Sequence, residues 1–192
     1  TLLRILATFM RPNKGQGRLL GFDLYKQARE IRQHIGLVSH DSLLYEDLTG
    51  YENLKFYGRM YDVPNLEERI AEITRQVGME ARLHHRVGTL SHGMRKRFAI
   101  ARAAIHKPSI ILLDEPETGL DQHALGMLTE ILDTLGPNRT VIMTTHNMGQ
   151  GLRLANQVGI LVRGKLAFLG PKPTDDGAAF ADIYQHFVEV HQ

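Results

Sequence analysis

Two adjacent carboxylates, Asp114 and Glu115, end the short aliphatic run SIILLDE. Four aliphatic residues in a row are typical of a buried parallel strand, and ligands of open α/β sheets bind beyond the carboxyl ends of such strands. An aspartate at that position can hold Mg²⁺ directly or through water, while the next carboxylate can orient or deprotonate a water molecule. The alternative is a strand that ends in a solvated acidic turn. The full run DEPETGLD favours the chemical interpretation.

A second polar group lies upstream, in LSHGMRKRFAIARAAIHKP (90–108). Ser91 precedes a predicted amphipathic helix, and with Gly93 it offers a phosphate a hydroxyl, bare amides and the positive end of a helix dipole. The run RKR that follows suggests nucleic acid, but three charges on such a helix are usually on its solvated side. We therefore expect an anion site at Ser91 and Gly93, and no nucleic-acid partner.

A third polar residue, His146, closes the stretch TVIMTTH (140–146). A single histidine is more often structural than functional, but a polar side chain at the carboxyl end of a second core strand can reach the same crevice as the acids. The other nine histidines form no recognisable zinc-ligand spacing, which argues against a zinc site.

The elements that must position these residues alternate along the chain. Aliphatic runs at 34–40, 109–115, 140–146 and 158–162 are separated by helical patterns, which predicts a largely parallel α/β core. The last run continues through Arg163-Gly164 into KLAFLG, which predicts a hairpin. Helical patterns dominate from 47 to 90. The opening TLLRILATFM predicts a largely buried helix, and KGQGRLLG is interpreted as a turn and not as a dinucleotide-binding loop.

Composition narrows the class of protein. The 192 residues suffice for one domain, contain no cysteine and carry a net charge of +2, with acids and bases mixed along the chain. Disulfide frameworks and thiolate metal sites are therefore excluded. No apolar run is long enough to span a bilayer, so any membrane-spanning part is expected in another chain.

The motifs LSHGM, ILLDEPETGLD and TTH, in that order, resemble those of the ATP-binding cassette (ABC) ATPases. The resemblance implies an α/β fold, a mostly parallel sheet of the P-loop NTPase type with an inserted helical subdomain and a C-terminal hairpin. It implies one ABC ATPase domain over 1–192, divided into an α/β core at 1–46 and 107–170, a helical subdomain at 47–106 with the signature motif, and a C-terminal tail at 171–192.

By this resemblance the cofactors are ATP and Mg²⁺, and the protein hydrolyses ATP in a head-to-tail dimer with a second ABC ATPase subunit. Each motif residue then has an implied role. Asp114 of the Walker B strand is on the Mg²⁺ shell, Glu115 is the general base, Ser91 and Gly93 contact the γ-phosphate of ATP held by the opposite subunit, Asp121 belongs to the loop between subunits, and His146 is the switch histidine.

The opening helix has a place in the same family. It follows the phosphate-binding Walker A loop G-x-x-x-x-G-K-[ST], so Thr1 would lie just beyond that loop and beside the nucleotide. The 192 residues do not contain the loop. We therefore expect the sequence to be an N-terminally truncated piece that is inactive by itself.

Three residues, in two motifs, depart from the family pattern. His40 stands where a glutamine usually follows the strand IGLVS, and an imidazole cannot reproduce the contact of an amide oxygen with Mg²⁺ and water. In the signature, His92 and Met94 replace the commoner Gly and Gln. We count His40 among the nucleotide-site residues. Whether it couples the nucleotide site to a membrane subunit stays open.

The resemblance implies a cytoplasmic subunit, peripheral on the inner face of the cell membrane, that drives transport through transmembrane permease subunits. Leu43, Leu44 and Tyr45 are expected to form an apolar anchor for the permease. VSHDSLLYEDLTGYENLKFY with LSHGMRKR looks most like the haem-exporter ATPases of cytochrome c maturation and multidrug-type relatives. Two alternatives stay open: a soluble, non-transport ABC ATPase of the translation or DNA-maintenance kind, and a non-catalytic fragment that acts only by binding a partner.

Overall fold

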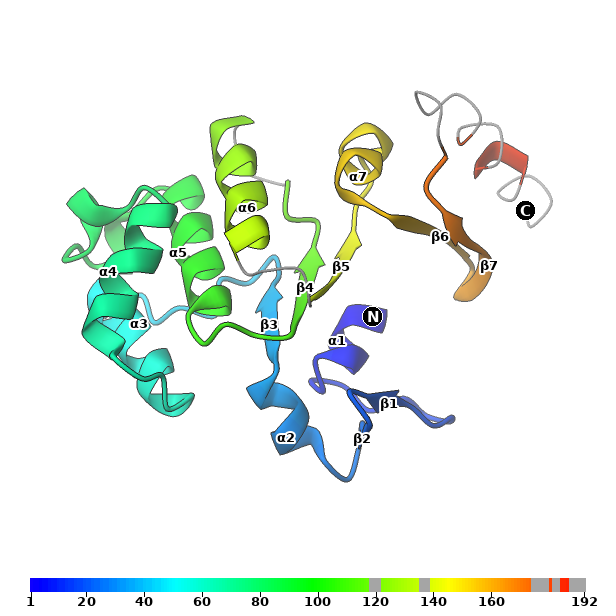
Figure 1. Ribbon diagram of the computed structural model, residues 1–192, viewed down its shortest axis with the longest axis horizontal. Helices are drawn as coiled ribbons and strands as arrows, with labels where there is room; N and C mark the ends of the chain where they lie inside the picture. Colours follow the sequence, from blue (N-terminus) through cyan, green and yellow to red (C-terminus); the bar gives the residue numbers. More distant parts are fainter. Residues whose placement is uncertain (118–121, 135–138, 174–179, 181–183, 187–192) are drawn as a thin grey trace. The chain divides into compact units, whose positions relative to one another are not determined.

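The computed structural model describes residues 1–117, 122–134, 139–173, 180 and 184–186. The chain divides into two compact units, Thr1–Thr144 and Thr145–Gln192. The first contains the parallel sheet with its helices, and the second contains a short helix and a β-hairpin (Figure 1).

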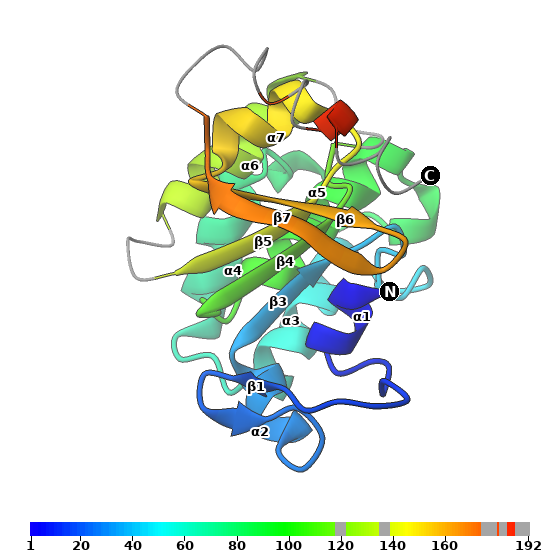
Figure 2. The ribbon, with the colours of Figure 1, turned by 90° about the vertical axis from the view of Figure 1, so that its right-hand side faces the viewer.

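Three parallel strands form the centre of the first unit: β3 (Ile35–Val38), β4 (Ile110–Asp114) and β5 (Thr140–Thr144). β4 lies between the other two, and the three strands run side by side in Figure 2. The predicted strands and the α/β fold class are confirmed. Because parallel strands end at one edge of a sheet, the residues that follow β3 and β4 meet there.

The helices predicted between 47 and 106, and the one that follows β4, are present. α3 (Gly50–Met60) begins with a capping box, in which the Thr49 hydroxyl accepts from the Glu52 N–H and the Glu52 carboxylate accepts from the Thr49 N–H. The other elements of this part are α4 (Leu66–Gln76), the 3₁₀ turns η1 (Glu80–Arg82) and η2 (Val87–Thr89), α5 (His92–Ala104) and α6 (Gln122–Thr134).

The two faces of the sheet pack against different helices, because successive strand side chains point to opposite sides. Ile111 and Leu113 join the core that α3, α4, α5 and α6 build, whereas Ile110 and Leu112 join a smaller core with the first thirty or so residues. α5 approaches β3 most closely at Gly36, where an added Cβ would lie 2.3 Å from the Ala103 carbonyl oxygen. Only glycine fits this close approach.

The first residues form short elements: α1 (Leu2–Leu6), β1 (Arg18–Leu19), β2 (Phe22–Asp23) and α2 (Ala28–Gln33). The prediction of a largely buried opening helix is wrong. α1 ends at Leu6, and of the ten opening residues only Leu3 and Ala7 are buried. KGQGRLLG is not one turn as predicted: only its last two residues, Leu20 and Gly21, form a turn, and that turn joins β1 to β2 in a hairpin that was not predicted.

The second unit confirms the predicted hairpin. β6 (Gln157–Val162) pairs in antiparallel fashion with β7 (Lys165–Pro171), and Arg163 and Gly164 both have positive φ in the two-residue turn. α7 (Met148–Leu154) precedes this hairpin. Most of the predicted C-terminal tail at 171–192 falls outside the described residues.

Candidate active site

Asp114 and Glu115 lie where the sequence predicted them, at the carboxyl end of the central strand. The Thr144 hydroxyl, from β5, donates a 2.6 Å hydrogen bond to Asp114 Oδ1. The backbone N–H of Glu115 donates to the Thr144 carbonyl at 3.0 Å, so pairing with β5 continues to the second acid. Both acids are half-buried. The neighbouring strand therefore orients Asp114 and leaves its other oxygen for a ligand.

The backbone of Glu115 adopts a left-handed conformation, with φ of 47°. A residue with a Cβ pays roughly 1–2 kcal/mol there, and such conformations cluster at functional sites. The strand ends abruptly at this point and Pro116 is buried directly after it. The carboxylate of Glu115 is thus held at the sheet edge and does not continue the strand.

The second predicted group lies at the N-terminus of α5. Ser91 is the N-cap, and its Oγ accepts a hydrogen bond from the Met94 N–H at 3.3 Å. Ser91 is exposed and Gly93 is half-buried in the first turn. The Ser91 hydroxyl still has its own proton to donate, and the first-turn amides point out of the helix end, so this end offers several donors to an anion.

A polar cavity of about 360 Å³ lies between this helix end and the loop that follows β3. His40 and His92, two of the three residues that depart from the family pattern, both line it. Arg95 and Glu46 close one side with an ion pair of 3.3 Å. His40 is therefore near the signature end of α5, which its position in the sequence does not reveal.

Lys96 also lines this polar cavity. The prediction that it lies on the solvated side of the helix is wrong, because its side chain is buried and only 5% exposed. Burial lowers the pKa of its ammonium group, and the charges of Glu117, Asp114 and Glu115 oppose that shift. The signal was present in the sequence, because Lys96 precedes the buried Ala99 and Ala103 by three and seven residues, which is one face of a helix.

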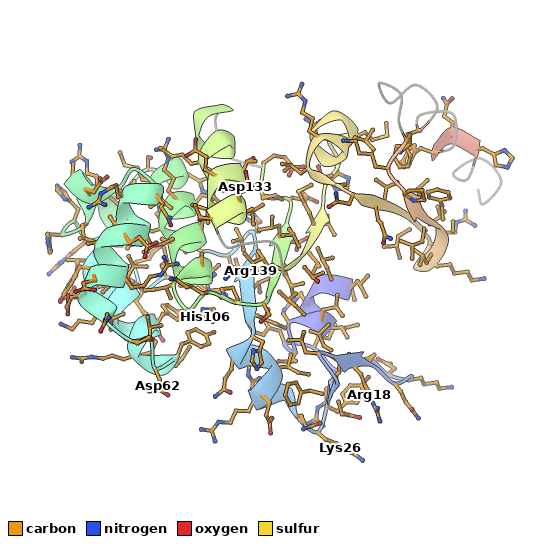
Figure 3. The ribbon with its side chains drawn as sticks, in the orientation of Figure 1. Arg18, Lys26, Asp62, His106, Asp133 and Arg139 are labelled. Carbon is orange, nitrogen blue, oxygen red and sulfur yellow. The ribbon has the colours of Figure 1, made fainter. Side chains whose placement is uncertain are left out.

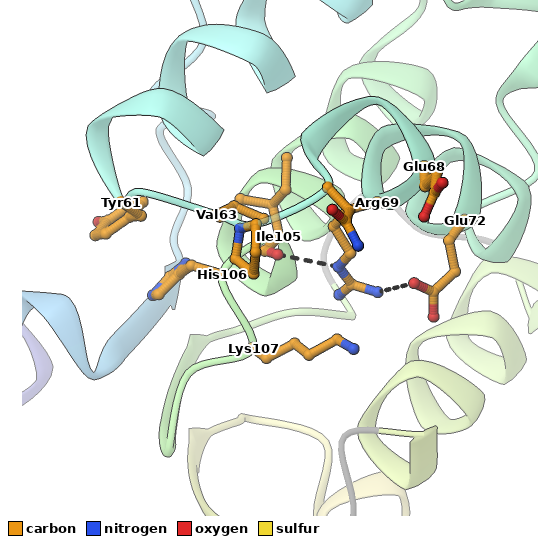
Figure 4. Close-up of a pocket in the computed structure, with 10 residues that line it drawn as sticks. Tyr61, Val63, Glu68, Arg69, Glu72, Ile105, His106 and Lys107 are labelled. Carbon is orange, nitrogen blue, oxygen red and sulfur yellow. Dashed lines mark hydrogen bonds and ion pairs between the residues drawn. The ribbon is translucent and has the colours of Figure 1, made fainter.

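A second cavity, of about 480 Å³, lies at the opposite end of α5 (Figure 4). Arg69 of α4 is buried there; its Nε and Nη2 donate to the carbonyls of Ile105 and Ala104 at 3.0 and 2.8 Å, and its Nη1 pairs with Glu72 at 2.9 Å. The last carbonyls of a helix lack partners within it, so Arg69 caps α5.

His106 lines the same cavity, beside β3 in Figure 3. Its ring stacks on Tyr61 with centroids 3.9 Å apart, and its Nε2 lies 3.1 Å from the Ile35 carbonyl oxygen. A carbonyl only accepts, so Nε2 carries the proton. Burial lowers the pKa of His106 to about 4, which keeps the ring neutral.

Of the other predicted site residues, two are exposed and one lies outside the described parts. Thr1 is exposed at the start of α1, and His146 is exposed in the second unit, two residues beyond β5. Asp121 lies outside the described residues. Their roles stay predictions.

The donor set suits Mg²⁺ better than a protein-only metal cage. Among the described residues no group of three or more His, Cys, Asp or Glu side chains is arranged to hold a metal ion. Mg²⁺ in nucleotide sites takes one or two carboxylates together with phosphate oxygens and waters. Asp114, a carboxylate oriented by one hydrogen bond, fits that pattern.

The model of the ABC transporter family matches residues 1–118 of the chain. The chain is also 36% identical over 174 residues to the ABC transporter ATP-binding protein NatA of Bacillus subtilis, which covers 88% of the chain and 71% of the relative. The chain belongs to the ABC transporter ATP-binding proteins. The resemblance drawn from LSHGM, ILLDEPETGLD and TTH is confirmed, and with it the class of ABC-type ATPase.

Further ABC relatives show the range of named functions. The chain is 33% identical to the daunorubicin resistance ATP-binding protein DrrA2 of Streptomyces coeruleorubidus, over 86% of the chain and 52% of the relative. It is 33% identical to the Nod factor export ATP-binding protein I of Cupriavidus metallidurans, over 96% of the chain and 62% of the relative. The chain therefore spans between about half and three quarters of the length of these proteins.

Solved structures agree on the fold. The structure of an ATP binding subunit of an ABC transporter matches with a TM-score of 0.87 and 24% identity, over 97% of the chain and 81% of that structure. An ATP-binding cassette in a dimeric, post-hydrolysis state bound to ADP and Pi matches with a TM-score of 0.81 and 23% identity, over 91% and 80%. Within the part of the ABC chain that the structure describes, none of the helices has the length and apolarity that crossing a membrane requires.

Proposed function

We propose that this chain is the catalytic part of an ATP-hydrolysing subunit that drives an ABC transporter. The observation that carries the proposal is the pair of acids at the end of β4, with Asp114 oriented by Thr144 and Glu115 held in a left-handed turn. One acid suits a cation and the other suits a water molecule, which is the division of labour that phosphoryl transfer to water requires.

In this proposal Asp114 holds Mg²⁺, which when bound to ATP neutralises charge that develops on the phosphates. Glu115 accepts a proton from the attacking water as the bond from the water oxygen to the γ-phosphorus forms and the bond from that phosphorus to the bridging oxygen of the leaving ADP breaks. Thr144 keeps the Asp114 carboxylate in one orientation. Thr1 and His40 border the same nucleotide. The protein part of the reaction is thus positioning and proton transfer.

We further propose that the working form is a head-to-tail dimer. Ser91 and Gly93 then contact the γ-phosphate of ATP in the partner subunit, and Asp121 and His146 act at the same interface. The N-terminus of α5 supports this arrangement, because Ser91 and His92 are exposed to solvent. The dimeric, post-hydrolysis structure of a cassette with the same fold supports it as well.

The membrane partner is proposed to be a permease that docks beside the loop after β3. Of the predicted apolar anchor only Tyr45 is exposed, at 50%, and it packs edge-on against exposed Phe56. Leu43 and Leu44 are half-buried and each packs against one of the two cores, so we assign the exposed part of the predicted anchor to Tyr45. The proposed contact is therefore Tyr45 with Phe56, on the helical subdomain at 47–106, on the cytoplasmic face of the membrane.

The cargo is proposed from the sequence pattern alone. Haem export in cytochrome c maturation and multidrug-type export are the two classes that the stretches around His40 and Ser91 resemble. The relative DrrA2 is named for daunorubicin resistance, which is nearest to the second class; another relative is named for Nod factor export, and the name of NatA states no cargo.

The test is ATP turnover by the extended protein, meaning this chain joined to the Walker A segment that the resemblance places before Thr1. We expect Mg²⁺-dependent release of phosphate that EDTA abolishes. Asp114→Asn should lower turnover at least 100-fold because the cation loses its charged ligand, whereas Glu130→Gln, an exposed acid of α6, should leave it unchanged. Turnover without Mg²⁺, or an active Asp114→Asn protein, contradicts the proposal.

A further inference from the structure

Basic side chains reach from α5 and the turn after it to the outer edge of β3. β3 is the edge strand of the described sheet, so the carbonyls on that side have no strand partner. Each of three alternate carbonyls receives a donor instead. The pairs are Lys96 Nζ with the Ser39 carbonyl at 3.3 Å, Arg102 Nη2 with the Leu37 carbonyl, and His106 Nε2 with the Ile35 carbonyl at 3.1 Å.

These three pairs, the basic ladder, join α5 to β3 along the whole strand. Residues two apart on a strand present their carbonyls to the same side, which is why the acceptors are alternate residues. Gly36 allows the close approach of the helix that the short contacts require. The helix and the strand are thus tied at both ends and in the middle.

Lys96 is the member of the basic ladder nearest to the proposed reaction. It is buried, and buried lysines need partners because an unpaired ammonium is costly outside water. Its hydrogen-bond partner is the Ser39 carbonyl, directly after β3. The acids at the end of β4 add an electrostatic attraction. Lys96 therefore contacts the loop that leads to His40, and the negative charges of Glu117, Asp114 and Glu115 favour its charged form.

We infer that Lys96 is a positioning residue of the ATPase reaction, which fixes the Ser39–His40 loop relative to the signature end of α5. This inference rests on the proposed function. Lys96 touches neither substrate nor the proposed cation; it acts through its hydrogen bond to the Ser39 carbonyl. Lys96 lies five positions after Ser91, in the helix that Ser91 caps, so one helix joins the signature residue to this loop.

The experiment compares Lys96→Met with Lys96→Arg and Arg97→Met in the extended protein. Methionine keeps the buried length and removes the charge. Arg97 is a matched control because it lies on the same helix but contacts Met127 of α6. We expect Lys96→Met to lower kcat about 10–100-fold with KM for ATP within about threefold, the signature of a lost positioning contact. Lys96→Arg should restore kcat to within about threefold, and Arg97→Met should retain it.

Two results overturn the inference. One is an unchanged kcat in Lys96→Met; the other is a loss of kcat that Lys96→Arg does not restore and that follows a lowered unfolding temperature, which indicates a purely structural role. If the parent extended protein shows no turnover, the proposed function fails instead.

In that case hydrogen exchange in the 192-residue chain still tests whether Lys96 holds the Ser39–His40 loop in place. Lys96→Met should accelerate exchange of the amides of 39–42 at least about fivefold, and Arg97→Met should not. Equal exchange in both variants overturns the inference.

Discussion

The two ends of α5 are built in opposite ways. At its C-terminus Arg69 caps the Ala104 and Ile105 carbonyls, and the neutral ring of His106 stacks on Tyr61. At its N-terminus Ser91 is exposed and satisfies only the Met94 amide through its side chain. One end is tied into the core, and the other offers donors to solvent.

This difference assigns work to each end. A helix terminus whose groups are already paired can only hold structure, whereas one that keeps open donors at a positive dipole can bind an anion. Changes at the C-terminal end should therefore alter the free energy of unfolding, and changes at the N-terminal end should alter nucleotide-dependent behaviour without unfolding the protein.

The largest effect is expected from Ser91→Arg in the extended protein. ATP-driven dimerisation should weaken at least about 100-fold because a long charged side chain fills the phosphate site, while ATP binding by each monomer stays nearly the same. Gel filtration with ATP measures the first and titration measures the second. Ser91→Thr, which keeps the hydroxyl and the cap, should still dimerise. Equal loss of monomer binding and dimerisation would place Ser91 elsewhere.

Arg69→Met should break the closed end. Two buried carbonyls lose their donors, at about 1–3 kcal/mol each, so the free energy of unfolding should fall by about 2–6 kcal/mol. Urea denaturation of the 192-residue chain measures this. The control is Arg75→Met, an exposed arginine in the last turn of the same helix, which should change the free energy of unfolding by no more than about 0.5 kcal/mol. Similar losses in both variants would refute the capping role.

A smaller effect at the closed end is a dependence of stability on pH. The pKa of His106 is about 4 in the folded chain, against 6.5 as its ordinary value. The unfolded chain therefore takes up a proton between these values and the folded chain does not, so this group's contribution to stability is retained above pH 6.5 and is lost as pH falls toward 4. From pH 7 to 5 the loss should be about 2 kcal/mol.

His106→Gln should remove that part of the pH dependence, and His85→Gln, an exposed histidine, should keep it. Urea titrations at pH 5, 6 and 7 make the comparison. If the free energy of unfolding does not change with pH in the parent protein, and does not change in His85→Gln either, the lowered pKa of His106 is contradicted.

Much of this arrangement was predictable because it depends on local patterns. The aliphatic run before Asp114 indicates a buried strand, the run before Thr144 indicates a neighbouring strand, and the acids directly after the first run indicate a site at the sheet edge. The Arg163-Gly164 hairpin follows from two residues that tolerate or require positive φ between two β-rich runs.

The rest depends on contacts between residues far apart in the chain. Lys96 carries the same charge as Arg95 and Arg97, and only the packing of α5 on β3 separates the buried one from its neighbours. Leu43 and Leu44 are apolar in a loop, and only the cores on either side decide that they are packed and that Tyr45 is exposed. The opening helix was overestimated because apolar periodicity does not state which side a short helix buries.

The most direct test of the account is the chemical state of nucleotide held by Glu115→Gln in the extended protein. The variant is incubated with Mg²⁺ and radiolabelled ATP, freed of unbound nucleotide, and the retained label is separated into ATP and ADP. With the proton acceptor removed, hydrolysis should slow about 10²–10⁴-fold. Retained nucleotide should therefore be almost entirely ATP in the variant and largely ADP in the parent. ADP in both would contradict the assignment of Glu115 as the base and with it the division of labour between the two acids of β4.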